Sequence, residues 1–127
     1  MIVVDSSGWV EHLTDGPLAD AYAEHLSAGD LLVPTIVLYE VCKFMRREVS
    51  ADAAAAVAAR LKEERVVPLD ERLALEAAEV SLQHGLAMAD AIVYATALYF
   101  GATLLTSDAD FRDLPHVEYL TAGPSAP

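Results

Sequence analysis

The chain has few cysteines and few basic residues. These two features bear on the compartment of the protein and on the charge of its partners. Cys42 is the only cysteine in 127 residues, so no disulfide can form within the chain. A lone cysteine is typical of a reducing compartment, and we expect the protein to be cytoplasmic. Only 8 Lys and Arg stand against 20 Asp and Glu, for a formal net charge of −12. Such a surface repels phosphate backbones at long range and attracts basic partners.

Several common site motifs are also missing. The sequence has no glycine-rich phosphate loop. Ser6 and Ser7 follow a predicted strand without the surroundings of a catalytic serine, so capping of the next helix and support of Asp5 are the better interpretation. The histidines are scattered without the spacing of zinc ligands: His12, His25, His84 and His116.

Nothing in the sequence indicates a signal peptide or a membrane span. The first residues, MIVVDSSGW, lack a basic region and meet an acid at Asp5. The 17 residues from Ala91 to Ser107 carry no charge, but Gly101 interrupts them and acids flank them. We therefore interpret this run as a buried segment of a protein without membrane contact.

Short apolar runs alternate with helical patterns along the chain. Strands are predicted at 2–4, 31–33, 66–69, 103–106 and 117–120. Helices are predicted after a cap at Ser6 or Ser7 and over 18–28, 35–49, 51–64, 70–84 and 90–100. This alternation is typical of the α/β class, with a mostly parallel sheet of about five short strands flanked by helices. We expect a single domain over residues 1–121 and a disordered tail over 122–127.

Four acids occupy positions that a parallel sheet would bring together. Asp5 and Asp108 each follow a predicted buried strand, and the carboxyl ends of parallel strands share one edge. Glu40 lies one turn into the helix after the second strand, and Asp90 opens the helix that leads to the fourth. Taken singly, Asp90 could be a first-turn acid favoured by the helix dipole, and Glu40 a solvated helix residue.

A convergence of these acids would require a cation. Carboxylates that lie close together repel one another, and no Lys or Arg immediately flanks Asp5, Asp90 or Asp108. Oxygen ligands suit Mg²⁺ or Mn²⁺, which can activate water for attack on a phosphodiester. Beyond Glu40, a small basic face predicts either a grip on phosphate or a solvated surface: Lys43, Arg46 and Arg47.

The chain resembles the PIN-domain ribonucleases of the VapC toxin type. The resemblance rests on IVVDSSGWVEHL, PTIVLYEVCKFMRR, GLAMADAIVYATALYFGATLLTSDADF and the apolar strand at 117–120. It implies an Mg²⁺-dependent endoribonuclease toxin of a type II toxin–antitoxin pair, with Mn²⁺ able to substitute. It further implies an RNA substrate, a homodimer, and a VapB-like antitoxin that inserts a segment into the active site. Lys43, Arg46 and Arg47 would contact RNA or the antitoxin.

The resemblance also assigns roles residue by residue. Asp5, Glu40, Asp90 and Asp108 match the family's acidic catalytic positions. Metal would be bound by Asp5, Asp90 and Asp108, with Glu40 acting directly or through water. Asp110 matches an acid often found near the site and is a possible further ligand. Thr106 matches a supporting hydroxyl, and Ser6 is expected to support the site as well. Ser107 departs from the pattern, because relatives often carry Arg or Lys there.

Two alternatives remain open at the level of sequence. The first is a PIN-like binding subunit without activity, which the presence of all four acids argues against. The second is a phosphoacceptor domain of the receiver type, which would need paired acids after the first strand and a lysine after a late one. Here Ser6 follows Asp5, and Ser107 follows Thr106.

Overall fold

The chain folds around one parallel β-sheet. A computed structural model describes residues 1–27 and 29–121. Its five strands lie in the order β3-β2-β1-β4-β5, and every neighbouring pair is parallel. The strands are β1 (Ile2–Val4), β2 (Leu31–Pro34), β3 (Arg65–Val67), β4 (Thr103–Thr106) and β5 (Val117–Tyr119). The predicted α/β class with a five-stranded parallel sheet is confirmed.

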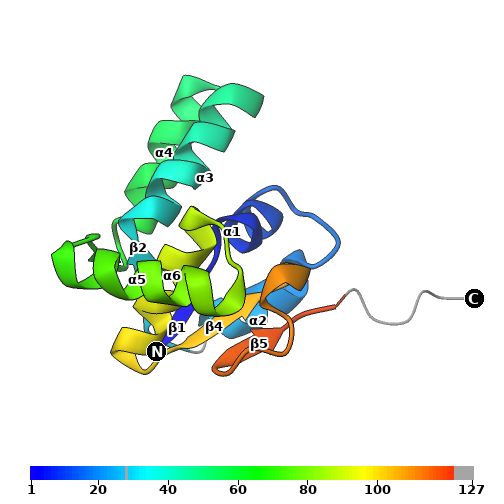
Figure 1. The fold of residues 1–127 in the computed structure, drawn as a ribbon. Coiled ribbons are helices and arrows are strands. Elements are labelled where there is room, and N and C mark those ends of the chain that lie inside the picture. The colour runs from blue at the N-terminus through cyan, green and yellow to red at the C-terminus, as the bar shows by residue number, and fades with distance from the viewer. Residues whose placement is uncertain (28, 122–127) are drawn as a thin grey trace, which may run out of the picture.

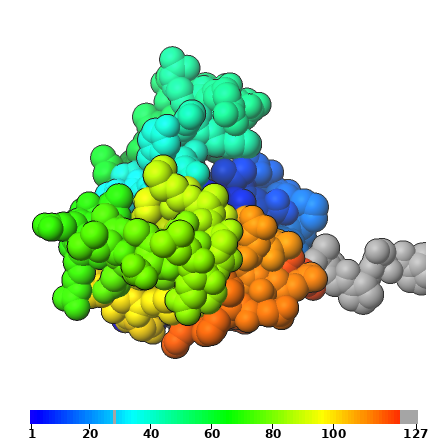
Figure 2. Space-filling view, viewed as in Figure 1, coloured from blue at the N-terminus to red at the C-terminus, as the bar shows by residue number. Residues whose placement is uncertain are grey.

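Helices connect the strands and cover the sheet. They are α1 (Ser6–Leu13), α2 (Ala19–Ser27), α3 (Thr35–Glu48), α4 (Ala51–Leu61), α5 (Glu71–His84) and α6 (Met88–Phe100), with a 3₁₀ turn η1 (Ala109–Phe111). Figure 1 shows α5 and α6 in front of the sheet and α2 behind it. The hairpin of α3 and α4 projects from the rest of the molecule (Figure 2). In the part of the chain that is described, no helix has the length and apolar character needed to cross a membrane.

The uncharged run predicted to be buried is the central helix of the fold. All seven residues from Ala91 to Ala97 are buried, so α6 is enclosed around its circumference and not only on one face. It contacts α5 and α3, and also β1 and β4 of the sheet. Gly101 ends the helix in the left-handed conformation, with φ of 63°, as the sequence predicts. The run is not buried throughout, because Leu98 and Tyr99 at the end of α6 are exposed.

The order of strands creates a switch point between β1 and β4. From β1 the chain moves first toward β2 and β3, and it returns to the other side of β1 only at β4. Ligands of open α/β sheets bind at such points, beyond the carboxyl ends of the strands. The parallel register pairs Val4 with Leu105. Asp5, the first residue after β1, therefore lies beside Thr106, the last residue of β4.

Some predicted boundaries are wrong. Asp5, not Ser6 or Ser7, caps α1, because its side chain accepts the Gly8 N–H. The third strand covers Arg65–Val67 and not 66–69. It ends before Pro68, which has no N–H for a sheet, and the Leu69 N–H donates instead to the Thr35 hydroxyl.

The other differences lie at element ends, where one or two residues are normal scatter. The helix predicted to open near Asp90 begins at Met88, so Asp90 is its third residue. The fourth helix ends at Leu61 and not at 64, the third at Glu48, and the last strand at Tyr119. The predicted end of the second helix at residue 28 and the tail over 122–127 lie outside the described residues.

Candidate metal centre at the carboxyl edge of the sheet

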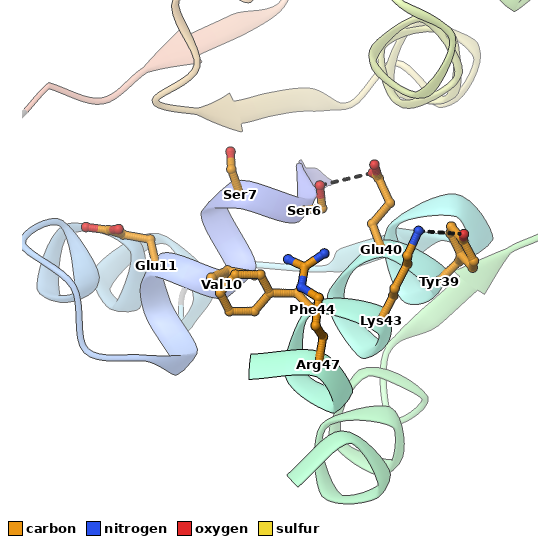
Figure 3. A pocket seen from close by; sticks show the side chains of 9 residues that line it. All are labelled: Ser6, Ser7, Val10, Glu11, Tyr39, Glu40, Lys43, Phe44 and Arg47. Carbon is orange, nitrogen blue, oxygen red and sulfur yellow. Dashed lines mark hydrogen bonds between the residues drawn. The ribbon is translucent and has the colours of Figure 1, made fainter. Parts of the chain in front are cut away.

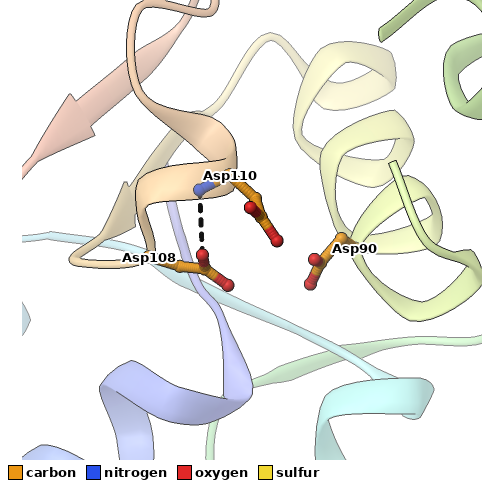
Figure 4. Close-up of side chains that lie close together, drawn as sticks. All are labelled: Asp90, Asp108 and Asp110. Atoms are coloured by element: carbon orange, nitrogen blue, oxygen red, sulfur yellow. Dashed lines mark hydrogen bonds between the residues drawn. The ribbon is translucent and has the colours of Figure 1, made fainter. Parts of the chain in front are cut away.

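Three carboxylates converge at the switch point. Asp90, Asp108 and Asp110 each offer one oxygen, and these atoms all lie within 4.8 Å of one another. Figure 4 shows the three side chains pointing into a common space, Asp90 from α6 and the other two from the turn after β4. Donors this close from separate elements are arranged as the ligands of a metal ion would be.

Local hydrogen bonds hold the turn that carries two of these acids. One residue, Ser107, separates Asp108 from the end of β4. The Asp108 Oδ1 accepts the Asp110 N–H at 2.9 Å, which caps η1. The Thr106 hydroxyl accepts the Asp108 N–H at 2.9 Å. Both backbone groups are therefore satisfied within the turn, and one Asp108 oxygen is left to face Asp90.

Asp5 is tied to the same turn and is almost fully buried, with 4% of its surface exposed. Its Oδ2 accepts the Thr106 hydroxyl at 2.7 Å and the Ser7 hydroxyl at 3.1 Å. Its Oδ1 accepts the Gly8 N–H at 2.9 Å. Thr106 thus donates to one acid and accepts from the backbone of Asp108.

The acids raise one another's pKa. Burial first, and then the charges of Asp108, Asp5, Asp110 and Glu40, raise the pKa of Asp90 to about 6. Burial also raises the pKa of Asp5, against the lowering by its hydrogen bonds from Thr106, Gly8 and Ser7. Among the described residues, no ion pair involves any of these acids. The cluster therefore concentrates negative charge that a bound cation would offset.

Glu40 lies where the acidic cluster meets a neighbouring cleft. It stands on α3, and its Oε1 accepts the Ser6 hydroxyl of α1 at 3.0 Å. The cleft encloses about 520 Å³ between these helices. In Figure 3, Glu40 and Arg47 project from α3 toward α1, and the Lys43 ammonium lies beside the Tyr39 hydroxyl. Glu40 is outside the group of three converging oxygens and is linked to it by charge.

Aromatic rings support the cations of this cleft. The Lys43 ammonium lies 5.5 Å from the centroid of Tyr39, and the Arg47 guanidinium lies 5.7 Å from that of Phe44. Arg46, predicted as part of the same basic face, is exposed and does not line the cleft. The 100° step between neighbouring helix residues turns it away from the i, i+4 row of Tyr39, Lys43 and Arg47.

The structure therefore groups the predicted site residues in two sets. Asp90 and Asp108 meet directly, together with Asp110, and Asp5 joins them through Thr106. Glu40, Lys43 and Arg47 face the cleft. The sequence reasoning missed the aromatic lining of the cleft, although the spacing of Tyr39, Lys43 and Arg47 on one helical row is visible in the sequence.

Toxins and toxin–antitoxin complexes are among the solved structures with the same fold. A toxin–antitoxin complex from Klebsiella pneumoniae is 19% identical, with a TM-score of 0.80 and 96% of this chain and 98% of that chain covered. VapC20 of Mycobacterium tuberculosis, described as a sarcin–ricin loop cleaving toxin, is 22% identical, with a TM-score of 0.73 and coverage of 87% and 92%. VapBC2 of Rickettsia felis, bound to a DNA fragment from its promoter, is 19% identical, with a TM-score of 0.74 and coverage of 94% and 98%. At these identities, the likeness establishes the fold.

Comparison with curated proteins finds no match. The family model of the PIN domain, in contrast, matches residues 2–117. That match covers the whole sheet apart from the end of β5, and it includes all of the acids described above. It excludes the receiver-type alternative. The chain belongs to the PIN-domain family.

Proposed function

We propose that this protein is a metal-dependent endoribonuclease, the VapC-type toxin of a type II toxin–antitoxin pair. The observation that carries the proposal is the convergence of three carboxylates beside a fourth, Asp5, with no basic partner among the described residues. Family membership supports nuclease chemistry, and the solved neighbours that are toxins support the biological class.

The donor set fits Mg²⁺, with Mn²⁺ as a substitute. All candidate ligands are carboxylate oxygens, which hard divalent cations prefer, and the cluster contains neither thiolate nor imidazole. Asp90, Asp108 and Asp5 would hold the ion, with Asp110 as a further ligand and Glu40 acting directly or through water. When bound, such an ion supplies an activated water and neutralises charge on a phosphodiester.

The remaining polar groups orient these ligands and the substrate. Thr106 fixes Asp5 and the backbone of Asp108 in one arrangement. Ser6 orients Glu40 at the mouth of the cleft. Lys43 and Arg47 would hold RNA phosphates next to the carboxylates, and the exposed ring of Tyr39 offers a surface on which a base can stack. Because the rest of the surface is acidic, RNA would be held mainly here.

The proposed partners follow from the same surface. A basic segment of a VapB-like antitoxin would be attracted to the acidic edge, and several solved neighbours are toxin–antitoxin complexes. A homodimer is supported by an apolar row on α5, where Leu75 and Leu82 are exposed, and by Met88, 72% exposed, at the start of α6. The mass of the protein in solution checks the dimer.

An inactive binding subunit is the disfavoured alternative, and a cleavage assay separates the two. Purified protein is incubated with an RNA pool in Mg²⁺, in Mn²⁺ or in chelator. We expect cleavage only with metal, and at least a thousandfold loss in Asp108→Asn, because removing a group that acts only with the metal forfeits its catalysis. Asn can still accept the Asp110 N–H, so the turn should persist.

The control is Asp52→Asn, which removes an exposed acid from the first turn of α4, far along the projecting hairpin. It should cleave like the wild type. Cleavage in chelator, or full activity of Asp108→Asn, would contradict the proposal. Asp5→Asn should also lose activity, but it removes an acceptor from two hydroxyls as well as a charge, so Asp108 is the cleaner test.

A further inference from the structure

A tyrosine distant in sequence is bonded to the turn that carries Asp108. Tyr22 of α2 is completely buried, and its hydroxyl shares a hydrogen bond with the Ser107 hydroxyl at 2.9 Å, across 85 positions of sequence. Ser107 stands between Thr106 and Asp108, two residues with roles already described. A hydrogen bond at Ser107 restrains the backbone between the end of β4 and Asp108.

Two consecutive side chains hold the backbone immediately before Asp108. The Thr106 hydroxyl donates to Asp5 and accepts the Asp108 N–H. The Ser107 hydroxyl is bonded to the Tyr22 hydroxyl of α2. The start of the turn is thus tied both to Asp5 and to α2, which limits how far Asp108 can shift relative to Asp5.

The position of the Tyr22 ring is set by the backbone of α1. A Cβ placed on Gly8 would lie 2.8 Å from Tyr22 Cε1, 2.9 Å from Asp5 Oδ1 and 2.7 Å from Val4 Cγ1. Only glycine leaves room for the ring there, and the same Gly8 donates its N–H to Asp5. Tyr22 therefore rests on the segment that presents Asp5 while its hydroxyl reaches the segment that presents Asp108.

We propose that Tyr22 is a positioning residue of the metal centre: through Ser107 it fixes Asp108 relative to Asp5. This inference rests on the proposed metal site and adds a residue to which that proposal gives no role. Burial raises the pKa of Tyr22 to about 12, so the hydroxyl keeps its proton over the whole working range of pH. Titration of Tyr22 therefore does not break the hydrogen bond at neutral pH.

The test measures Mn²⁺ affinity directly, from the electron paramagnetic resonance signal of free Mn²⁺. Tyr22→Phe keeps the ring and deletes only the hydroxyl. Loss of a group that orients a metal ligand weakens metal binding by on the order of tenfold, and we expect that loss here. Ser107→Ala deletes the same bond from the other side and should weaken binding to the same extent. The double variant should be no weaker than either single variant, because both remove one interaction.

Tyr94→Phe is the matched control. Tyr94 is also a buried tyrosine, and its hydroxyl donates to the Pro115 carbonyl at 2.7 Å, away from Ser107. The Tyr94→Phe variant should have a lower melting temperature and an unchanged Mn²⁺ affinity. Wild-type affinity in Ser107→Ala or in folded Tyr22→Phe, or an equal loss in Tyr94→Phe, would overturn this inference alone. If Tyr22→Phe did not fold, Ser107→Ala would decide. Absence of Mn²⁺ binding by the wild type would overturn the metal site and this inference with it.

Discussion

The acidic cluster and the adjoining cleft differ in charge and are built in different ways. The cluster consists of acids, whereas Lys43 and Arg47 line the cleft together with Glu11 and Glu40. Asp5 and Asp108 leave neighbouring strands, and their positions are fixed by backbone N–H groups and a shared threonine. Lys43 and Arg47 stand on one row of α3 and rest on aromatic rings. The first region is thus specified by sheet topology, and the second by the surface of one helix.

The difference shows how an acidic protein can hold a polyanion. The net charge of −12 describes the average surface, whereas a substrate meets the local arrangement. Two of only 8 basic residues are placed together beside the acidic cluster. A metal on one side and two side-chain cations on the other would hold a phosphate backbone between them. Attraction confined to one place favours selective binding over general affinity for nucleic acid.

Bound metal should have the largest effect on stability, and this effect should depend on the acidic cluster alone. A ligand that binds only the folded state at a hundred times its Kd stabilises by about 2.7 kcal/mol. For a domain of this length that corresponds to a rise of about 10 °C in Tm. Wild type should show this rise in excess Mn²⁺ relative to chelator, and Asp108→Asn should show much less.

In chelator, the Tm of Asp108→Asn should equal or exceed that of the wild type, because the substitution removes one of the repelling charges. Thermal melts of both proteins, with Asp52→Asn as the control that responds like the wild type, check this. Equal responses to Mn²⁺ in wild type and Asp108→Asn would identify Asp108 as a cap of η1 and not as a ligand.

The pH dependence of the metal-free protein should be unusual, and it is the second way to test the acidic region. The folded pKa of Asp90 is about 6, above its ordinary value of 3.8. Between these values the folded state holds a proton that the unfolded state has lost, so stability falls as pH rises through this window and is then constant. The raised pKa of Asp5 adds in the same direction.

Asp90→Asn removes the Asp90 contribution. In chelator, the Tm of this variant should gain on that of the wild type from pH 4 to pH 6 and keep that gain at pH 7. The change should be smaller than the metal response, because Asp90 is partly exposed and solvent screens its interactions. A gap in Tm that stayed constant from pH 4 to pH 7 would show that neither burial nor the neighbouring charges raise the pKa of Asp90.

The acidic region was also the part that sequence could predict. Strand ends, the glycine stop at Gly101 and the uncharged run of α6 are local patterns, and parallel pairing then places Asp5 beside Asp108. The bond from Tyr22 to Ser107 joins residues 85 apart and depends on the packing of α2, which no local pattern records. Asp5 as the cap of α1 was missed because Ser6 and Ser7 are equally good caps by type, and only the exact start of α1 decides between them.

The contribution of the cleft should be measurable in the salt dependence of RNA binding. Each phosphate contact on a single strand contributes about 0.7 to the slope of log affinity against log salt, so Lys43→Gln with Arg47→Gln should reduce the slope by about 1.4. Arg46→Gln, on the same helix but off the cleft, should leave it unchanged. RNA binding by an inactive Asp108→Asn background, measured at several salt concentrations, checks both. Equal slopes for the double variant and its parent would assign this surface to the antitoxin or to solvent.

The smallest effects should come from the two serines that separate the regions. Ser6 donates to Glu40 at 3.0 Å on the cleft side, and Ser7 donates to Asp5 at 3.1 Å on the metal side. Each bond is only part-buried, so water can replace the lost donor, and a cost of about 0.7 kcal/mol, or about threefold, is expected.

Ser6→Ala should lower kcat/KM for RNA by about threefold and leave Mn²⁺ affinity unchanged, whereas Ser7→Ala should weaken Mn²⁺ binding to a similar extent. The two substitutions are chemically identical and adjacent, so each controls for the other. Parallel titrations with Mn²⁺ and RNA separate them. If both variants changed the same quantity, the acidic cluster and the cleft would be one continuous site, and Glu40 would belong to the metal as directly as Asp5 does.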